Sequence, residues 1–134
     1  MQTLVIIVFE KQPRWTPELQ RQFASEAVDV VGCSTSGDFE RRCVNSSVGV
    51  VDVDAAPQDC LQLLGRLART GEFPPIIAIG SEQTAALEWP LREFGVLEFA
   101  VDRPTGDHLA RLCSRQWSNS HEPGRPRGSA SAGN

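Results

Sequence analysis

No hydrophobic run in this sequence of 134 residues is long enough to cross a membrane as a helix. The N-terminal run from Leu4 to Phe9 is also too short for a secretory signal, and no basic residue precedes it. Basic residues alternate with acidic ones around a net charge of −4, so no basic stripe indicates a nucleic-acid-binding surface. The sequence therefore predicts a cytoplasmic protein that binds neither membrane nor nucleic acid.

Cysteine pairs of the CxxC type are missing as well. The four cysteines, at positions 33, 43, 60 and 113, each lie in an apolar context or at the end of an expected element. They are expected to be buried, reduced thiols, and the two histidines have no Cys, Asp or Glu partner at metal-ligand spacing. We therefore predict no resident metal and no cofactor.

Five short apolar segments alternate with segments of helical spacing. The apolar segments are rich in β-branched residues, which is typical of strands buried on both faces of a parallel sheet. They cover residues 3–9, 28–34, 47–53, 75–80 and 95–101. Thr16 is expected to cap the first helix, and Pro90 is expected to end or kink the fourth.

This alternation predicts an α/β fold. Right-handed crossovers place consecutive strands parallel to one another, so we expect a doubly wound five-stranded parallel sheet of order 2-1-3-4-5 with helices on both faces. Residues 1–117 would form this domain. Residues 118–134 have no apolar side chain larger than alanine and are expected to form a disordered tail.

Polar residues follow the expected strands, where the carboxyl ends of a parallel sheet carry chemistry. Residues 49–57 read GVVDVDAAP, and their two carboxylates could hold a metal ion, accept a phosphoryl group or cap the next helix. For Asp54 and Ser81 the expected role is to cap a helix, and Glu10 is expected to be a solvated loop acid. Asp52 stays open between a phosphoacceptor or metal ligand and a structural carboxylate bonded to loop N–H groups or to Arg103.

The layout resembles the receiver domain of two-component response regulators over about residues 3–117. The segments that carry the resemblance are VGVVDVDAAPQDCLQLLGRL, PPIIAIGS and FAVDRPTGDHLARL. The resemblance implies a pocket in which an acidic pair binds Mg²⁺ and an aspartate takes a phosphoryl group, whose oxygens contact a hydroxyl and a lysine. A weaker likeness, around PIIAIG and the following Trp-Pro, is to receiver-like segments at the start of σ54-dependent flagellar activators.

Several positions of that pocket depart from the resemblance. Phe9 stands beside Glu10 where two acids are expected, and phenylalanine offers no ligand to Mg²⁺. The position of the acceptor falls on Val53, between the two aspartates, and one extra loop residue would restore Asp52. The hydroxyl position falls on Gly80, one residue before the serine.

Lysine is the clearest loss. The only lysine of the chain is Lys11, in the first loop, so no register places a lysine after the fifth strand. Arg103 stands there instead, and a planar guanidinium is not equivalent to a compact ammonium at a tight site. The pocket of Glu10, Asp52, Asp54, Ser81 and Arg103 therefore resembles a degenerate receiver site.

The function that this pattern predicts is that of a pseudo-receiver, a signalling module that binds proteins without enzymatic phosphoryl transfer. The alternative is a working phosphoacceptor receiver that uses Asp52 with Mg²⁺. A small phosphatase is disfavoured, because the DxD motif of haloacid-dehalogenase-like phosphatases follows a first strand and needs a downstream lysine. FMN binding is disfavoured because the loop EKQPRWT blocks a nest of backbone N–H groups.

The resemblance also implies a partner or self-association surface from the fourth helix through the fifth strand to the fifth helix. In this part of the chain, Trp89 lies beside the expected helix break at Pro90 and is expected to be partly exposed. Leu91, Arg92 and Arg111 are expected on the same interaction face.

Overall fold

The computed structural model describes residues 3–101 and 104–120. Its strands are β1 (Leu4–Phe9), β2 (Val28–Cys33), β3 (Val48–Asp52), β4 (Ile76–Ile79) and β5 (Val96–Ala100). Its helices are α1 (Trp15–Gln22), α2 (Ser36–Cys43), α3 (Pro57–Thr70), the 3₁₀-helix η1 (Glu82–Leu87), α4 (Glu88–Glu93) and α5 (Gly106–Ser120).

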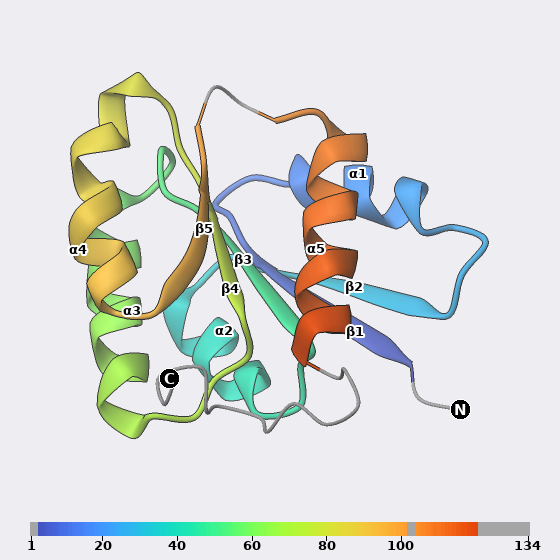
Figure 1. Ribbon diagram of the computed structural model, residues 1–134, viewed down its shortest axis with the longest axis horizontal. Coiled ribbons are helices and arrows are strands. Elements are labelled where there is room, and N and C mark those ends of the chain that lie inside the picture. The colour runs from blue at the N-terminus through green and yellow to red at the C-terminus, as the bar shows by residue number, and fades with distance from the viewer. Residues whose placement is uncertain (1–2, 102–103, 121–134) are drawn as a thin grey trace.

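The five strands form one sheet with the order β2-β1-β3-β4-β5, and every neighbouring pair is parallel. α1 and α5 cover one face of this sheet, and α2, α3 and α4 cover the other (Figure 1). The doubly wound fold and strand order that the sequence predicts are thereby confirmed.

Strand alternation divides the core into two layers. In β1, Ile6 and Val8 pack beneath α1 and α5, whereas Ile7 and Phe9 pack beneath α2 and α3. All four side chains are buried, because each face of this interior strand lies under helices. Continuous apolar runs, rather than alternating ones, follow from this burial on both sides.

The segment between β4 and β5 differs from the single helix that the sequence predicts. Its first part, η1, is a 3₁₀-helix, and α4 begins at Glu88. Pro90 does not end a helix, because it lies in the first turn of α4, where a backbone N–H has no intrahelical partner to lose.

The expected domain boundary after residue 117 falls inside α5, which continues to Ser120. Most of the expected tail lies outside the described residues. In the described part of the chain, no helix has both the length and the apolar composition needed to span a membrane.

Candidate functional site

Four of the five residues of the sequence-predicted pocket follow the carboxyl ends of three adjacent strands. Glu10 follows β1, Asp52 and Asp54 lie at and just after the end of β3, and Ser81 follows β4. These strands are neighbours in the sheet, so the structure brings the four residues to one edge. Arg103 lies outside the described residues.

Glu10 has a structural role that the sequence did not indicate. Its Oε1 accepts a hydrogen bond from the N–H of Trp15 at 2.9 Å, and its Oε2 accepts from the N–H groups of Arg14 (3.1 Å) and Thr16 (2.9 Å). The residue is only 5% exposed. Glu10 is therefore a buried cap of α1. The prediction that Glu10 is a solvated loop acid is wrong, and so is the prediction that Thr16 caps this helix.

The side chains on either side of Glu10 also contact other parts of the protein. Phe9 is buried and packs against Phe39 with ring centroids 6.1 Å apart. The ammonium of Lys11 lies 3.0 Å from the carboxylate of Asp59 and 5.4 Å from the centroid of the Phe9 ring. The only lysine of the chain is therefore held between α3 and the first loop, with its charge paired.

Asp52 is a half-buried carboxylate in an acidic neighbourhood. Burial raises its pKa above the ordinary value of 3.8, and the nearby Asp54 and Glu10 carboxylates raise it further. A hydrogen bond from the backbone N–H of Ala55 and the charge of Arg14 act in the opposite direction. Asp52 thus has the loop N–H contact that the structural interpretation predicts.

Asp54 does not cap the following helix. The cap of α3 is Ala56, and no side chain bonds to it there. The Asp54 carboxylate instead accepts a hydrogen bond of 2.6 Å from the Thr84 hydroxyl. This bond joins the loop after β3 to η1, two segments that are 30 residues apart in the sequence.

Thr84 is the site residue that sequence reasoning missed. Its hydroxyl also accepts a bond from the Ser81 N–H at 3.2 Å, and Ser81 in turn caps η1 by accepting from the Gln83 N–H. Ser81 is therefore confirmed as a helix cap. The signal that could have revealed Thr84 is the S-x-x-T spacing of a capping box.

The Thr84 hydroxyl occupies the space beside Gly80, the position where the resemblance expects a hydroxyl residue. A Cβ atom on Gly80 would lie 2.6 Å from Thr84 Oγ1 and 2.7 Å from the ring of Phe99. Both Thr84 and Phe99 are buried. The site thus has a hydroxyl near the expected place, but this hydroxyl comes from η1 and is bonded to Asp54.

These residues do not fit a Mg²⁺ ion. Magnesium needs near-octahedral oxygen ligation, and the expected second acid is the buried Phe9. Both carboxylate oxygens of Glu10 and Oδ1 of Asp54 accept hydrogen bonds from donors of the protein. Among the described residues, no three His, Cys, Asp or Glu side chains are grouped so that they could hold a metal.

The four expected interaction residues are not all on the surface. Trp89 is 72% exposed, which confirms the predicted exposure, but Leu91 is fully buried on the inner side of α4 and cannot contact a partner. Arg92 is exposed and bonds to Glu88 and to the Leu97 carbonyl. Leu91 belongs to the hydrophobic layer that α2, α3 and α4 form with the sheet.

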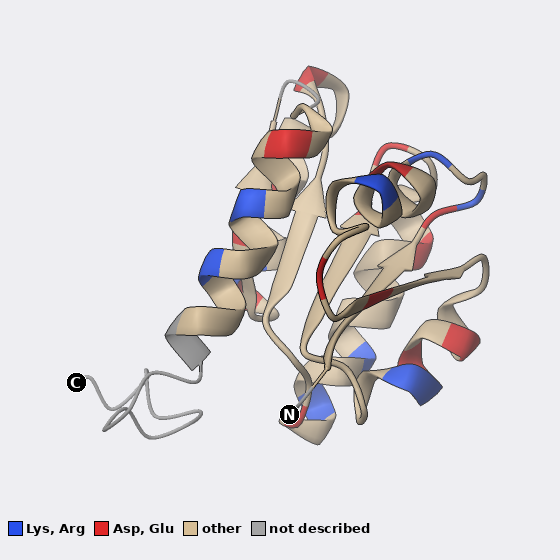
Figure 2. Cartoon of the chain, turned by 90° about the vertical axis from the view of Figure 1, so that its right-hand side faces the viewer, with Lys and Arg blue, Asp and Glu red and all other residues tan. Residues whose placement is uncertain are grey.

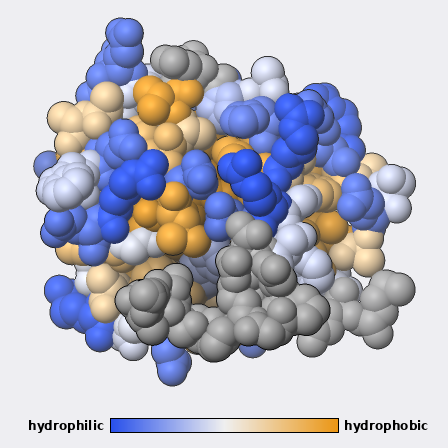
Figure 3. Space-filling view, in the orientation of Figure 1, coloured by the Kyte–Doolittle hydropathy of each residue, from blue (hydrophilic) through white to orange (hydrophobic). Residues whose placement is uncertain are grey.

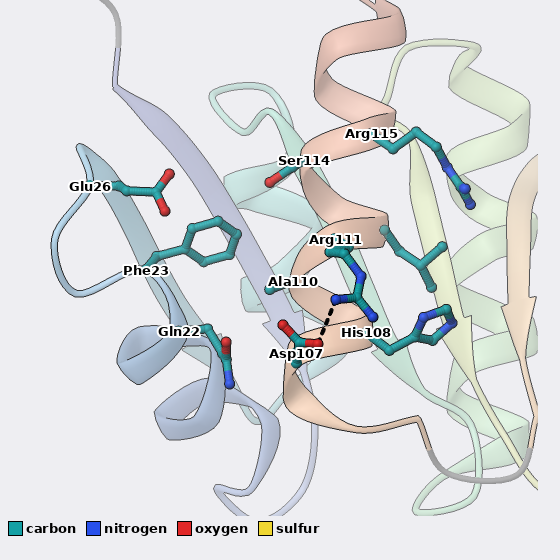
Figure 4. A pocket seen from close by; sticks show the side chains of 10 residues that line it. Gln22, Phe23, Glu26, Asp107, His108, Ala110, Arg111, Ser114 and Arg115 are labelled. Atoms are coloured by element: carbon teal, nitrogen blue, oxygen red, sulfur yellow. Dashed lines mark hydrogen bonds and ion pairs between the residues drawn. The ribbon is translucent and has the colours of Figure 1, made fainter.

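Arg111 lies elsewhere. It pairs with Asp107 at 2.6 Å and lines a groove between α1 and α5, as Figure 4 shows. Most of the charges in this region are paired within one helix, and blue and red segments are interspersed along the side of the molecule in Figure 2. Acidic and basic groups thus neutralise one another there.

All four cysteines are free and buried, as the sequence predicts. Burial raises the pKa of Cys33 to about 11 and those of Cys43, Cys60 and Cys113 to about 12. Thiols with such pKa values stay protonated at neutral pH, so none is an activated nucleophile.

No protein-family model matches the sequence, and no curated protein matches it by sequence comparison. Solved structures match it by fold. The receiver domain of the TMAO respiratory response regulator TorR has a TM-score of 0.70 at 18% identity, over 85% of this chain and 97% of that domain. The receiver domain of a LuxO repressor protein from Vibrio parahaemolyticus has a TM-score of 0.75 at 12% identity, over 88% of this chain and 92% of that domain.

Full-length FixJ from B. japonicum matches with a TM-score of 0.74 at 18% identity, over 92% of this chain. The match spans 61% of FixJ itself. The chain therefore has the receiver-domain fold of response regulators, as the sequence resemblance predicts.

Proposed function

We propose that the chain is a pseudo-receiver, a signalling module that acts through protein–protein contacts and does not transfer a phosphoryl group. The observation that carries this proposal is the use of Glu10. Its carboxylate, the one remaining acid after β1, accepts three backbone N–H groups and holds the start of α1. A metal ligand in this position would have to give up part of that cap.

Charge neutralisation is the second support. Phosphoryl transfer depends on cations that stabilise the charge developing on the phosphate oxygens. The chain has one lysine, and its ammonium is paired with Asp59. Among the described residues, Arg14 is the cation whose charge lowers the pKa of the half-buried Asp52, and burial with two acidic neighbours outweighs it.

The test is treatment with acetyl phosphate and Mg²⁺ followed by mass spectrometry of the intact protein. We expect no stoichiometric adduct, and no saturable response to beryllofluoride with Mg²⁺. An adduct that disappears in Asp52→Asn but persists in Asp59→Asn would refute the proposal. It would establish the alternative, a phosphoacceptor receiver that uses Asp52.

The interaction part of the proposal concerns the side of the molecule formed by α4 and β5. Its support is the 72% exposure of Trp89, because a tryptophan at the centre of an interface often contributes a large share of the binding energy. Two of the solved structures that share the fold are named as receiver domains, one of the response regulator TorR and one of a LuxO repressor protein, which agrees with a regulatory, non-enzymatic role.

A further inference from the structure

We draw no further inference here: the strongest candidate, the groove of about 500 Å³ between α1 and α5 that Phe23, Glu26, Asp107 and Arg111 help to line, carries none, because Asp107 neutralises Arg111, the hydrophobic side chains of the face in Figure 3 lie among hydrophilic ones, and nothing in the structure shows what covers the groove.

Discussion

The Thr84 hydroxyl donates a 2.6 Å hydrogen bond to the Asp54 carboxylate, and this bond joins the loop after β3 to the 3₁₀-helix after β4. Thr84 is buried and also accepts a bond from the Ser81 N–H. One hydroxyl thus stabilises the start of the η1–α4 segment and donates a hydrogen bond to a carboxylate at the end of the sheet. The position of Trp89 depends on the same segment.

Thr84→Val tests this link. Valine keeps the shape of threonine but removes both hydrogen bonds, so the free energy of unfolding should fall by about 1–2 kcal/mol. Urea denaturation measures this fall, with Thr70→Val as the control, because its hydroxyl bonds only near the exposed end of α3. A double-mutant cycle with Asp54→Ala should give a coupling energy above about 0.5 kcal/mol, and no coupling would contradict a direct bond.

Glu10→Gln should destabilise the chain by about 1–3 kcal/mol, because an amide has one acceptor oxygen for three N–H donors and lacks the charge that favours a helix N-terminus. Hydrogen exchange at the amides of Trp15 and Thr16 should accelerate in the same variant. Glu40→Gln, which alters a half-exposed pair with Arg66, is the control and should cost less than about 1 kcal/mol. Unchanged exchange at α1 would show that Glu10 does not cap it.

Asp52→Asn should stabilise the chain at neutral pH. The folded-state pKa of Asp52 is raised, chiefly by burial, so the ionised form opposes folding at pH values above that pKa. The advantage of the variant over the wild type should therefore shrink as the pH falls through the raised pKa, and level off below the ordinary value of 3.8. Urea denaturation of both proteins across acid pH checks the sign. An advantage that grows on acidification would mean a depressed pKa.

Gly80→Ala should lower the free energy of unfolding by about 1–3 kcal/mol, since the added methyl group meets Thr84 and Phe99 in a packed interior. Gly37→Ala is a matched control, because the nearest atom to its added Cβ is Arg41 Nη1 at 3.8 Å. The control should be neutral or slightly stabilising in helix α2. Thermal unfolding of the pair measures the difference, and equal effects would exclude crowding at Gly80.

The thiols should react slowly with iodoacetamide in the native protein at pH 8. Their pKa values of about 11 for Cys33 and about 12 for Cys60 and Cys113 leave little thiolate, and their side chains are buried. Mass spectrometry should find alkylation only after urea is added. Rapid modification of one cysteine without denaturant would reveal local opening at that position.

The strands and their order could be predicted because the signal for them is local. An apolar β-branched run such as Thr3–Phe9 is typical of a strand buried on both faces of a parallel sheet, and the rule for crossovers then limits the topology. The helix after β4 was predicted less well. Propensity alone does not distinguish a 3₁₀-helix followed by a short α-helix from one α-helix kinked at Pro90.

Side-chain roles at the site were predicted only where the partner is close in sequence. Ser81 caps η1 through Gln83, two residues away, and this cap was predicted. The bond of Asp54 goes to Thr84, 30 residues on, so the local expectation of a helix cap was wrong. The prediction for Leu91 was also wrong, because this residue packs in the core with side chains from distant elements.

By itself the sequence determined that one lysine and one acid are available after β1, because composition does not depend on long-range contacts. Its five apolar segments, alternating with segments of helical spacing, also predicted the parallel sheet. Only the tertiary structure decided what the polar groups do. Glu10 turns inward to the start of α1, Asp54 bonds to Thr84, and Trp89 stays outside, because each outcome depends on how loops at the end of the sheet pack against one another.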